Sequence, residues 1–205
     1  MKNEVFLEEN YTKEEIIVNI VWANIFVVIV LIISIILFGI PFYSLWHEKF
    51  MNIKIINLII NSPIQIIITI KNFAIYLLIL FSTIFIHELI HGIFFIIFSK
   101  NKFKSIKFGF MSVKKLFTPY CHCREKIKIN HYRIAIIMPL IIMGIIPTII
   151  SIIIGNLFLL FCGIICIMAA CGDILIYQKT LKQKRDSWIF DHPTEAGFYI
   201  YKKKN

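Results

Sequence analysis

Two histidines and a glutamate lie within five residues of each other, in His87-Glu88-Leu89-Ile90-His91. In a helix, residues i and i+4 share one face, so the two imidazoles can bind a single cation. Glu88 lies beside that face and can act on a ligand of the cation without binding the cation itself. This HExxH pattern is typical of zinc peptidases, in which the glutamate is the general base and zinc lowers the pKa of a water to about 7. The sequence therefore predicts a Zn2+ site with ligands His87 and His91 and the catalytic residue Glu88.

The motif lies inside an apolar stretch, residues 72–99. Ionisable side chains at the centre of a bilayer cost about 3 kcal/mol each on insertion scales, and they usually mark functional sites. A metal site would account for all three polar groups together. The alternative is a buried hydrogen-bonded cluster that only stabilises helix packing.

The elements that must position the motif are apolar segments long enough to cross a bilayer, which takes about 20 residues per helix. Of the 205 residues, 59% are hydrophobic, and the mean hydropathy is +0.80. The composition predicts an all-α integral membrane protein, with residues 1–205 as a single membrane-embedded domain. Four spans are expected, at 17–40, 72–99, 132–154 and 157–178.

Proline and glycine residues mark the ends and the weak points of these spans. Pro41 is expected to end the first span, and Pro139 and Pro147 are expected to kink the third. Gly155-Asn156 is the only connection between the last two spans, so they should form an antiparallel hairpin. Residues 53–71 stay ambiguous between a hairpin and an interfacial segment.

A third metal ligand is needed to complete a catalytic zinc site. Asp173 is the only other carboxylate within a predicted span, and small residues precede it, which lets helices approach closely. His91 lies eight residues before its span ends, or about 12 Å, and Asp173 lies five residues before its own, or about 7.5 Å. These similar depths predict Asp173 as the third ligand, with a hydrogen bond to the backbone or to Tyr177 as the alternative. The other candidates are His122, Glu125, His131 and His192.

The positive charges predict the orientation and one partner. The formal net charge is +10, with eight Lys and one Arg in 99–131 and seven Lys or Arg in 178–205. Lys and Arg collect on the cytoplasmic side and at anionic headgroups, so we expect a bilayer with anionic headgroups as a partner and no nucleic acid. This places 99–131 and the C-terminus in the cytoplasm. Four spans place the N-terminus there too.

The basic segment 99–131 also contains two alternating patterns, at 106–110 and at 126–129. They predict two short strands in a small cytoplasmic β-hairpin-like element. Its edge could hold an extended substrate, although a solvated basic loop on anionic lipid explains the pattern equally well. Cys121-His122-Cys123 has cysteines too close together for the usual zinc spacing and is not predicted to bind metal.

Several short motifs together resemble a known family. They are HELIHG at 87–92, YCHC at 120–123, MPLI at 138–141, CGDI at 171–174 and DHPTEAGF at 191–198. Over about residues 80–200 the chain resembles the putative zincin peptidase family of bacterial membrane proteins, which is similar in logic to site-2 proteases. The resemblance implies that His122 could stabilise an oxyanion, with a purely structural histidine as the alternative. Site-2 proteases usually carry Asp-Gly at the third ligand, whereas this chain has Gly172-Asp173 and no PDZ domain, so the general fold carries over better than substrate preference.

These observations together predict a multi-pass protein of the cell membrane that hydrolyses peptide bonds with Zn2+. Its substrate would be a membrane protein or peptide. The alternative is a non-catalytic metal-binding membrane protein, such as a sensor, a transporter or an immunity or interaction scaffold. Glu88 favours the enzyme, because a binding site needs no unliganded carboxylate beside the metal.

Overall fold

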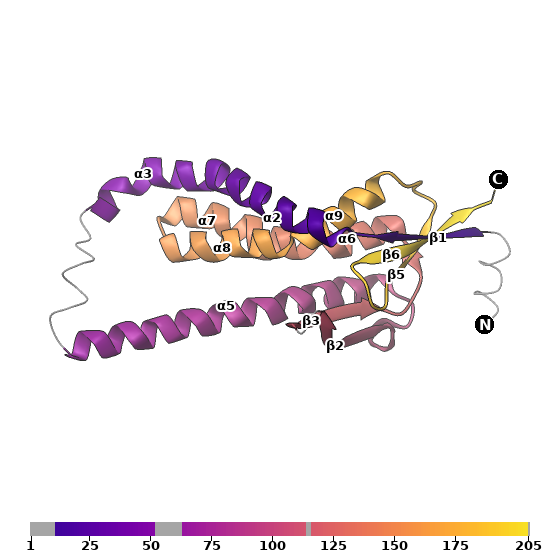
Figure 1. Ribbon diagram of the computed structural model, residues 1–205, viewed down its shortest axis with the longest axis horizontal. Coiled ribbons are helices and arrows are strands. Elements are labelled where there is room, and N and C mark those ends of the chain that lie inside the picture. Colours follow the sequence, from indigo (N-terminus) through magenta and orange to yellow (C-terminus); the bar gives the residue numbers. More distant parts are fainter. Residues whose placement is uncertain (1–10, 52–62, 114–115, 205) are drawn as a thin grey trace.

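The computed structural model describes residues 11–51, 63–113 and 116–204. Figure 1 shows an elongated molecule in which long helices run side by side and the strands gather at one end. Three of the described helices are long and apolar enough to cross a membrane, and a bent helix pair makes a possible fourth span. The mostly helical architecture with a small β element is therefore confirmed.

The first apolar segment forms one continuous helix that starts at Ile20. Asn19 caps it, because its side chain accepts a hydrogen bond from the Trp22 backbone N–H at 3.1 Å. The predicted end at Pro41 is wrong, since the helix continues to Met51. A π-helical turn precedes the proline, and its wider winding accommodates a residue that lacks an N–H. The parts are α2 (Ile20–Ser34), η1 (Ile35–Gly39) and α3 (Ile40–Met51).

The second segment is a single 36-residue helix, α5 (Pro63–Phe98). It carries the HExxH motif in its last three turns. It begins nine residues earlier than the predicted span, with a proline in its first position, where a missing N–H costs nothing. Residues 63–71 of the ambiguous segment are therefore helical, and residues 52–62 lie outside the described part of the chain.

The third segment is helical without interruption, although it contains two prolines. A π-helical stretch lies between Pro139 and Pro147 and absorbs the irregularity. Gly155 ends the segment in a left-handed conformation, at φ 67°, and Asn156 caps the following helix by accepting from the Leu159 N–H at 3.0 Å. The expected hairpin turn is therefore present. The parts are α6 (Ile129–Pro139), η3 (Leu140–Ile145) and α7 (Ile146–Ile154).

The fourth segment is bent by 47°. It consists of α8 (Leu157–Ala169) and α9 (Cys171–Leu181), which qualify as a span only together. The α7–α8 hairpin is closely packed, since a Cβ at Gly163 would lie 2.1 Å from the Thr148 hydroxyl oxygen. Asp173 lies in the first turn of α9, directly after the bend.

An antiparallel sheet of four strands joins the two ends of the chain, in the order β1-β6-β5-β4. The N-terminal strand pairs with the C-terminal one, so that Glu14 lies opposite Ile200. The sequence patterns did not predict this sheet. Its strands are β1 (Tyr11–Ile17), β4 (Ile127–Lys128), β5 (Trp188–Asp191) and β6 (Gly197–Lys203).

A second sheet is the hairpin of β2 (Ile106–Val113) and β3 (Leu116–Cys123), which follows the short 3-10 helix η2 (Lys102–Ser105). The strand predicted at 106–110 is confirmed. The strand predicted at 126–129 is also present, as β4, but its expected place in the hairpin is wrong, because Ile106 lies opposite Cys123 and β4 pairs with β5 in the other sheet.

The main core lies where the four-stranded sheet meets the ends of α5, α6 and α9. Tyr132 and Phe198 are fully buried in it, together with Phe95 from the turn after the HExxH motif. Apolar burial at this junction contributes about 25 cal/mol per Å2 and fixes the three helix ends relative to one another. The core therefore positions the motif on α5 against Asp173 on α9.

Candidate metal centre

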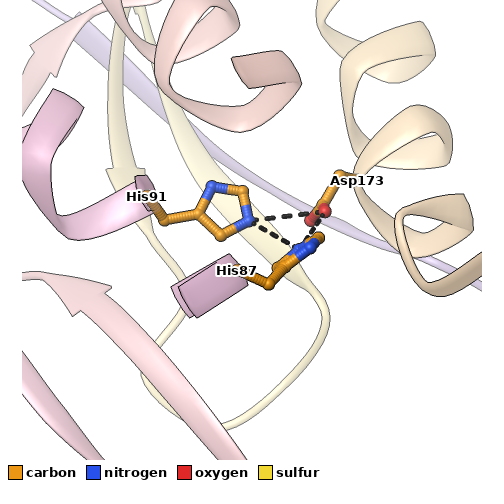
Figure 2. A group of neighbouring side chains, drawn as sticks. All are labelled: His87, His91 and Asp173. Carbon is orange, nitrogen blue, oxygen red and sulfur yellow. Dashed lines mark hydrogen bonds and ion pairs between the residues drawn. The ribbon is translucent and has the colours of Figure 1, made fainter. Parts of the chain in front are cut away.

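Three ionisable side chains converge where α5 meets α9 (Figure 2). His87 Nε2 lies 2.9 Å from Asp173 Oδ2, and His91 Nε2 lies 3.3 Å from the same oxygen. The two Nε2 atoms are 3.2 Å apart. Their side chains are only 12% (His87), 6% (His91) and 16% (Asp173) exposed. Within the described residues, this is the one group of three or more His, Cys, Asp and Glu side chains that could hold a metal ion.

Each side chain is brought there by a feature of its helix. The two histidines are four residues apart and so share a face of α5. Asp173 points at them because the 47° bend precedes it in the chain. A continuous straight helix would carry the carboxylate in a different direction. The sequence predicted the meeting of the three residues but not the bend.

The hydrogen bonds of the group test whether zinc would fit it. His91 Nδ1–H donates to the carbonyl oxygen of Ala135 at 2.9 Å, so its Nε2 carries the lone pair. His87 Nε2–H is then shared between two acceptors, His91 Nε2 and Asp173 Oδ2. A cation in place of that single proton would meet three lone pairs. Two neutral imidazoles and a carboxylate, one imidazole held by a backbone carbonyl, match the donors and outer partners that zinc takes in catalytic sites.

Glu88 lies beside this group and has a partner of its own. Its Oε2 accepts a hydrogen bond from the Cys121 backbone N–H on β3 at 2.7 Å. The β2–β3 hairpin reaches this place because Gly92 leaves room for it. A Cβ at Gly92 would lie 2.3 Å from the tip of the Phe108 ring. The glycine that follows HExxH thus lets the hairpin lie against the motif.

Two cavities with mostly apolar walls meet at Glu88, and they differ in that the first, called the polar cavity below, also carries several ionisable side chains. A cavity of about 360 Å3 has polar groups from β3 and from the β5–β6 loop, and it reaches Glu88, His91 and Asp173. A cavity of about 450 Å3 lies between α5 and α8. Its wall is mostly apolar, and it reaches His87 and Glu88.

His122 lines the first of these cavities and is held by a residue that the sequence analysis missed. Its Nδ1–H donates to Asp191 Oδ2 at 3.2 Å. Asp191 also accepts from the Cys123 N–H at 3.3 Å and from the Tyr132 hydroxyl at 3.0 Å. His122 Nε2 has no hydrogen-bond partner in the described part of the chain. The Asp-His pair in the terminal DHPTEAGF motif was the signal that could have drawn attention to Asp191.

The remaining candidates for the third ligand lie elsewhere. Glu125 accepts from the backbone N–H groups of Lys100 and Asn101 at the end of α5, at 2.8 and 3.1 Å. His131 stacks on Phe98 at 4.5 Å between ring centroids. His192 binds Glu15 of β1 at 2.8 Å. None of these belongs to the group formed by His87, His91 and Asp173.

The surroundings of the two cysteines in the CHC stretch favour protonated thiols. Burial raises the pKa of Cys121, and the nearby charge of Glu88 raises it further. Burial raises the pKa of Cys123 to about 12. A metal binds the thiolate, so these raised pKa values do not favour metal binding at Cys121 and Cys123, and the expectation that the stretch is not a metal site stays a prediction.

Comparison with known proteins agrees with the site. No curated protein and no solved structure matches the chain. The model of the family described as "Putative zincin peptidase" matches residues 80–188, just over half of the chain, and this range contains the HExxH motif and Asp173. The chain belongs to this zincin peptidase family.

Proposed function

We propose that this protein is a zinc metalloprotease that cleaves a polypeptide embedded in, or associated with, the membrane. His87, His91 and Asp173 would hold the metal, and Glu88 would be the base. The observation that carries the proposal is the position of the group between a polar cavity and an apolar one, with Glu88 lining both. Hydrolysis inside a membrane needs both environments, one for water and one for an apolar substrate.

Zinc bound to the three residues would supply a Lewis acid that polarises a peptide carbonyl and activates water near neutral pH. Glu88 takes up the proton. Its Oε2 is held by the Cys121 N–H at 2.7 Å, and its other oxygen has no partner in the described residues and can receive the proton. Because β3 already fixes the carboxylate, Glu88 has little orientational freedom to lose when it reaches the transition state.

His122 supports the developing negative charge on the carbonyl oxygen. Asp191 holds its Nδ1–H and thereby fixes the direction of the ring. When both ring nitrogens carry a proton, Nε2–H is left to donate into the polar cavity. Asp191 is a positioning residue in this scheme, since it acts through His122.

The apolar cavity suggests the route of the substrate. The part of α5 before the motif is exposed from residue 67 to residue 79, and it lies apart from α7 in Figure 1. Tyr76 of α5 stacks on Phe158 of α8 with ring centroids 4.3 Å apart. Between this stack and Glu88 lies the apolar cavity. An apolar substrate segment that separates the two rings would reach the base directly from the bilayer.

The pairing of β1 with β6 supports a topology of four crossings. These strands flank all of the candidate spans in the sequence, so they can pair only if they lie on one side of the membrane. An even number of crossings lies between them, and the bent pair α8–α9 then counts as the fourth. The positive charge of the connecting segments puts this side in the cytoplasm.

Glu88→Gln tests the mechanism, because the amide oxygen can still accept from Cys121 while the side chain can no longer take a proton. Purified protein in detergent, loaded with zinc, is incubated with a library of peptides that carry apolar transmembrane segments, and new peptide ends are identified by mass spectrometry. Cleavage should fall at least about 100-fold in Glu88→Gln, while zinc stays near one ion per chain. Glu14→Gln, an exposed carboxylate of β1, is the matched control. Cleavage by Glu88→Gln at the wild-type rate would refute the mechanism, and loss of zinc would make Glu88 a ligand.

One observation favours the second candidate, a non-catalytic metal-binding membrane protein. Glu88 binds the Cys121 N–H, so its carboxylate has a structural use and its presence alone does not require catalysis. The same experiment separates the two candidates. A protein that binds zinc but releases no new peptide ends from any library member supports the second.

A further inference from the structure

A third cavity lies away from the metal centre, between the start of α2 and the end of α9. Its volume is about 500 Å3. Both helix ends belong to segments that can span a membrane, and both lie near the four-stranded sheet in Figure 1. The cavity is therefore at the level where apolar helix gives way to polar chain. It is lined by Val18, Asn19, Val21, Trp22, Ile25, Leu175, Gln178, Lys179 and Lys182.

The lining is divided along the helix axes. Ile25 and Leu175 lie further into the spans, and together with Val21 in the first turn of α2 they give an apolar wall. Lys179 and Lys182 lie one and two turns further toward the end of α9 and carry the polar part. Trp22 lies next to Val21 in the first turn of α2 and is half exposed, which is typical of a residue at the membrane interface.

The charge of the lining is positive. It contains two lysines and no aspartate or glutamate among the described residues. Neither ammonium group has a hydrogen bond or ion pair within the described part of the chain. The first turn of α2 also faces the cavity and adds its positive helix end, although the Asn19 side chain takes the Trp22 N–H. The described residues of the lining therefore provide no negative group to neutralise Lys179 and Lys182.

We propose that this cavity binds one phospholipid with an anionic headgroup. The phosphate lies between Lys179 and Lys182, and an acyl chain lies along Val21 and Ile25. A basic pocket between membrane helices with an apolar floor fits such a lipid, whereas a free anion would leave the apolar wall uncovered. The inference uses none of the residues of the metal centre and stands independently of the peptidase proposal.

Trp22 provides a reporter inside the cavity. The protein is reconstituted in phosphatidylcholine vesicles that contain a small fraction of brominated lipid, which quenches tryptophan fluorescence on contact. The brominated lipid is phosphatidylglycerol in one arm and phosphatidylcholine in the other. Trp22→Phe identifies the part of the signal that comes from this residue, since the chain has three tryptophans. Brominated phosphatidylglycerol should quench the Trp22 signal more strongly than brominated phosphatidylcholine.

Two charge variants decide whether the cavity is responsible. Lys179→Gln/Lys182→Gln should weaken the preference for phosphatidylglycerol by roughly 25-fold, at about fivefold for each lysine. Lys184→Gln/Arg185→Gln changes the charge equally outside the lining and should keep the preference. Thermal unfolding checks that both variants are folded, and native mass spectrometry counts the bound lipid. Equal quenching in the two lipid arms, or an equal loss in both charge variants, would overturn the proposal. Release of the lipid by free glycerol phosphate would show that the cavity is a site for a soluble phosphate ester instead.

Discussion

Asp191→Asn should destabilise the protein strongly, because three donors converge on this single carboxylate. His122 Nδ1–H and the Cys123 N–H both point at Oδ2, and the Tyr132 hydroxyl points at Oδ1, at 3.2, 3.3 and 3.0 Å. Asparagine has one acceptor oxygen. If that oxygen keeps the hydrogen bond from the Tyr132 hydroxyl, the asparagine NH2 group faces the His122 and Cys123 donors and cannot accept from them.

The magnitude follows from this count. A hydrogen bond to a charged group contributes about 1.5–3 kcal/mol, and asparagine loses two of the three. The Asp191 side chain is 14% exposed, so water can replace part of the loss. We expect the free energy of unfolding to fall by about 2–4 kcal/mol. For a chain of this length that corresponds to a fall in melting temperature of about 5–15 °C.

Tyr132→Phe is the matched control, because it keeps the shape of a fully buried side chain and removes one of the three bonds. It should cost about 1–2 kcal/mol. Because both changes affect one network, the double variant should lose less than the sum of the two. Thermal and denaturant unfolding in detergent, with and without zinc, measures all four proteins. A loss below about 0.5 kcal/mol in Asp191→Asn, or a larger loss in Tyr132→Phe, would refute the picture of Asp191 as the shared acceptor.

Three further predictions concern regions outside the membrane helices. Cys121 and Cys123 should resist alkylation of the folded protein at pH 8. At a pKa of about 12, roughly one Cys123 thiol in 10,000 is ionised at this pH. A cysteine introduced at an exposed position serves as the reactive control. Partial burial opposes ionisation of Glu125, but the hydrogen bonds that its carboxylate accepts outweigh this and lower its pKa. The stability that Glu125 contributes is therefore present above its ordinary pKa of 4.5 and is lost as the pH falls below that value. Glu125→Gln should reduce this loss of stability at acid pH in unfolding measurements. In whole cells, a membrane-impermeant maleimide should label Asn156→Cys and miss Lys107→Cys, and the reverse pattern would overturn the proposed orientation.

The helices could be predicted from the sequence because their signals are local. An apolar run of sufficient length needs a helix in a bilayer, whatever the rest of the chain does. The errors lie at prolines. Pro41 has the signature of a helix end in water, but inside a membrane the chain gains more by keeping its hydrogen bonds, and a π-helical turn provides them.

The convergence of His87, His91 and Asp173 could be predicted because burying a carboxylate in an apolar segment is costly unless it has a partner. In the sequence, neither Asp173 nor the HExxH histidines had an evident polar partner, and the two sets of residues lie at similar depths along their helices. Asp191 could not be found by the same argument. It lies in a polar segment, where a carboxylate needs no explanation, and its three donors come from β3 and α6, far away in the sequence.

The four-stranded sheet explains why the ends of the chain matter for a site in its middle. β1 binds the β5–β6 loop through Glu15–His192 and through the Val18 N–H, which donates to the Ala196 carbonyl at 2.9 Å. That loop forms one wall of the polar cavity beside Glu88. Glu15 pairs with Tyr199 across a separation of 184 residues, and such long-range strand pairing leaves no local pattern that a single sequence can reveal. The cavity wall thus depends on the contact that is hardest to predict from the sequence, whereas the meeting of His87, His91 and Asp173 is the contact that is easiest to predict. Removing residues 1–17 should therefore leave His87, His91 and Asp173 able to bind zinc, while the polar cavity loses its outer wall.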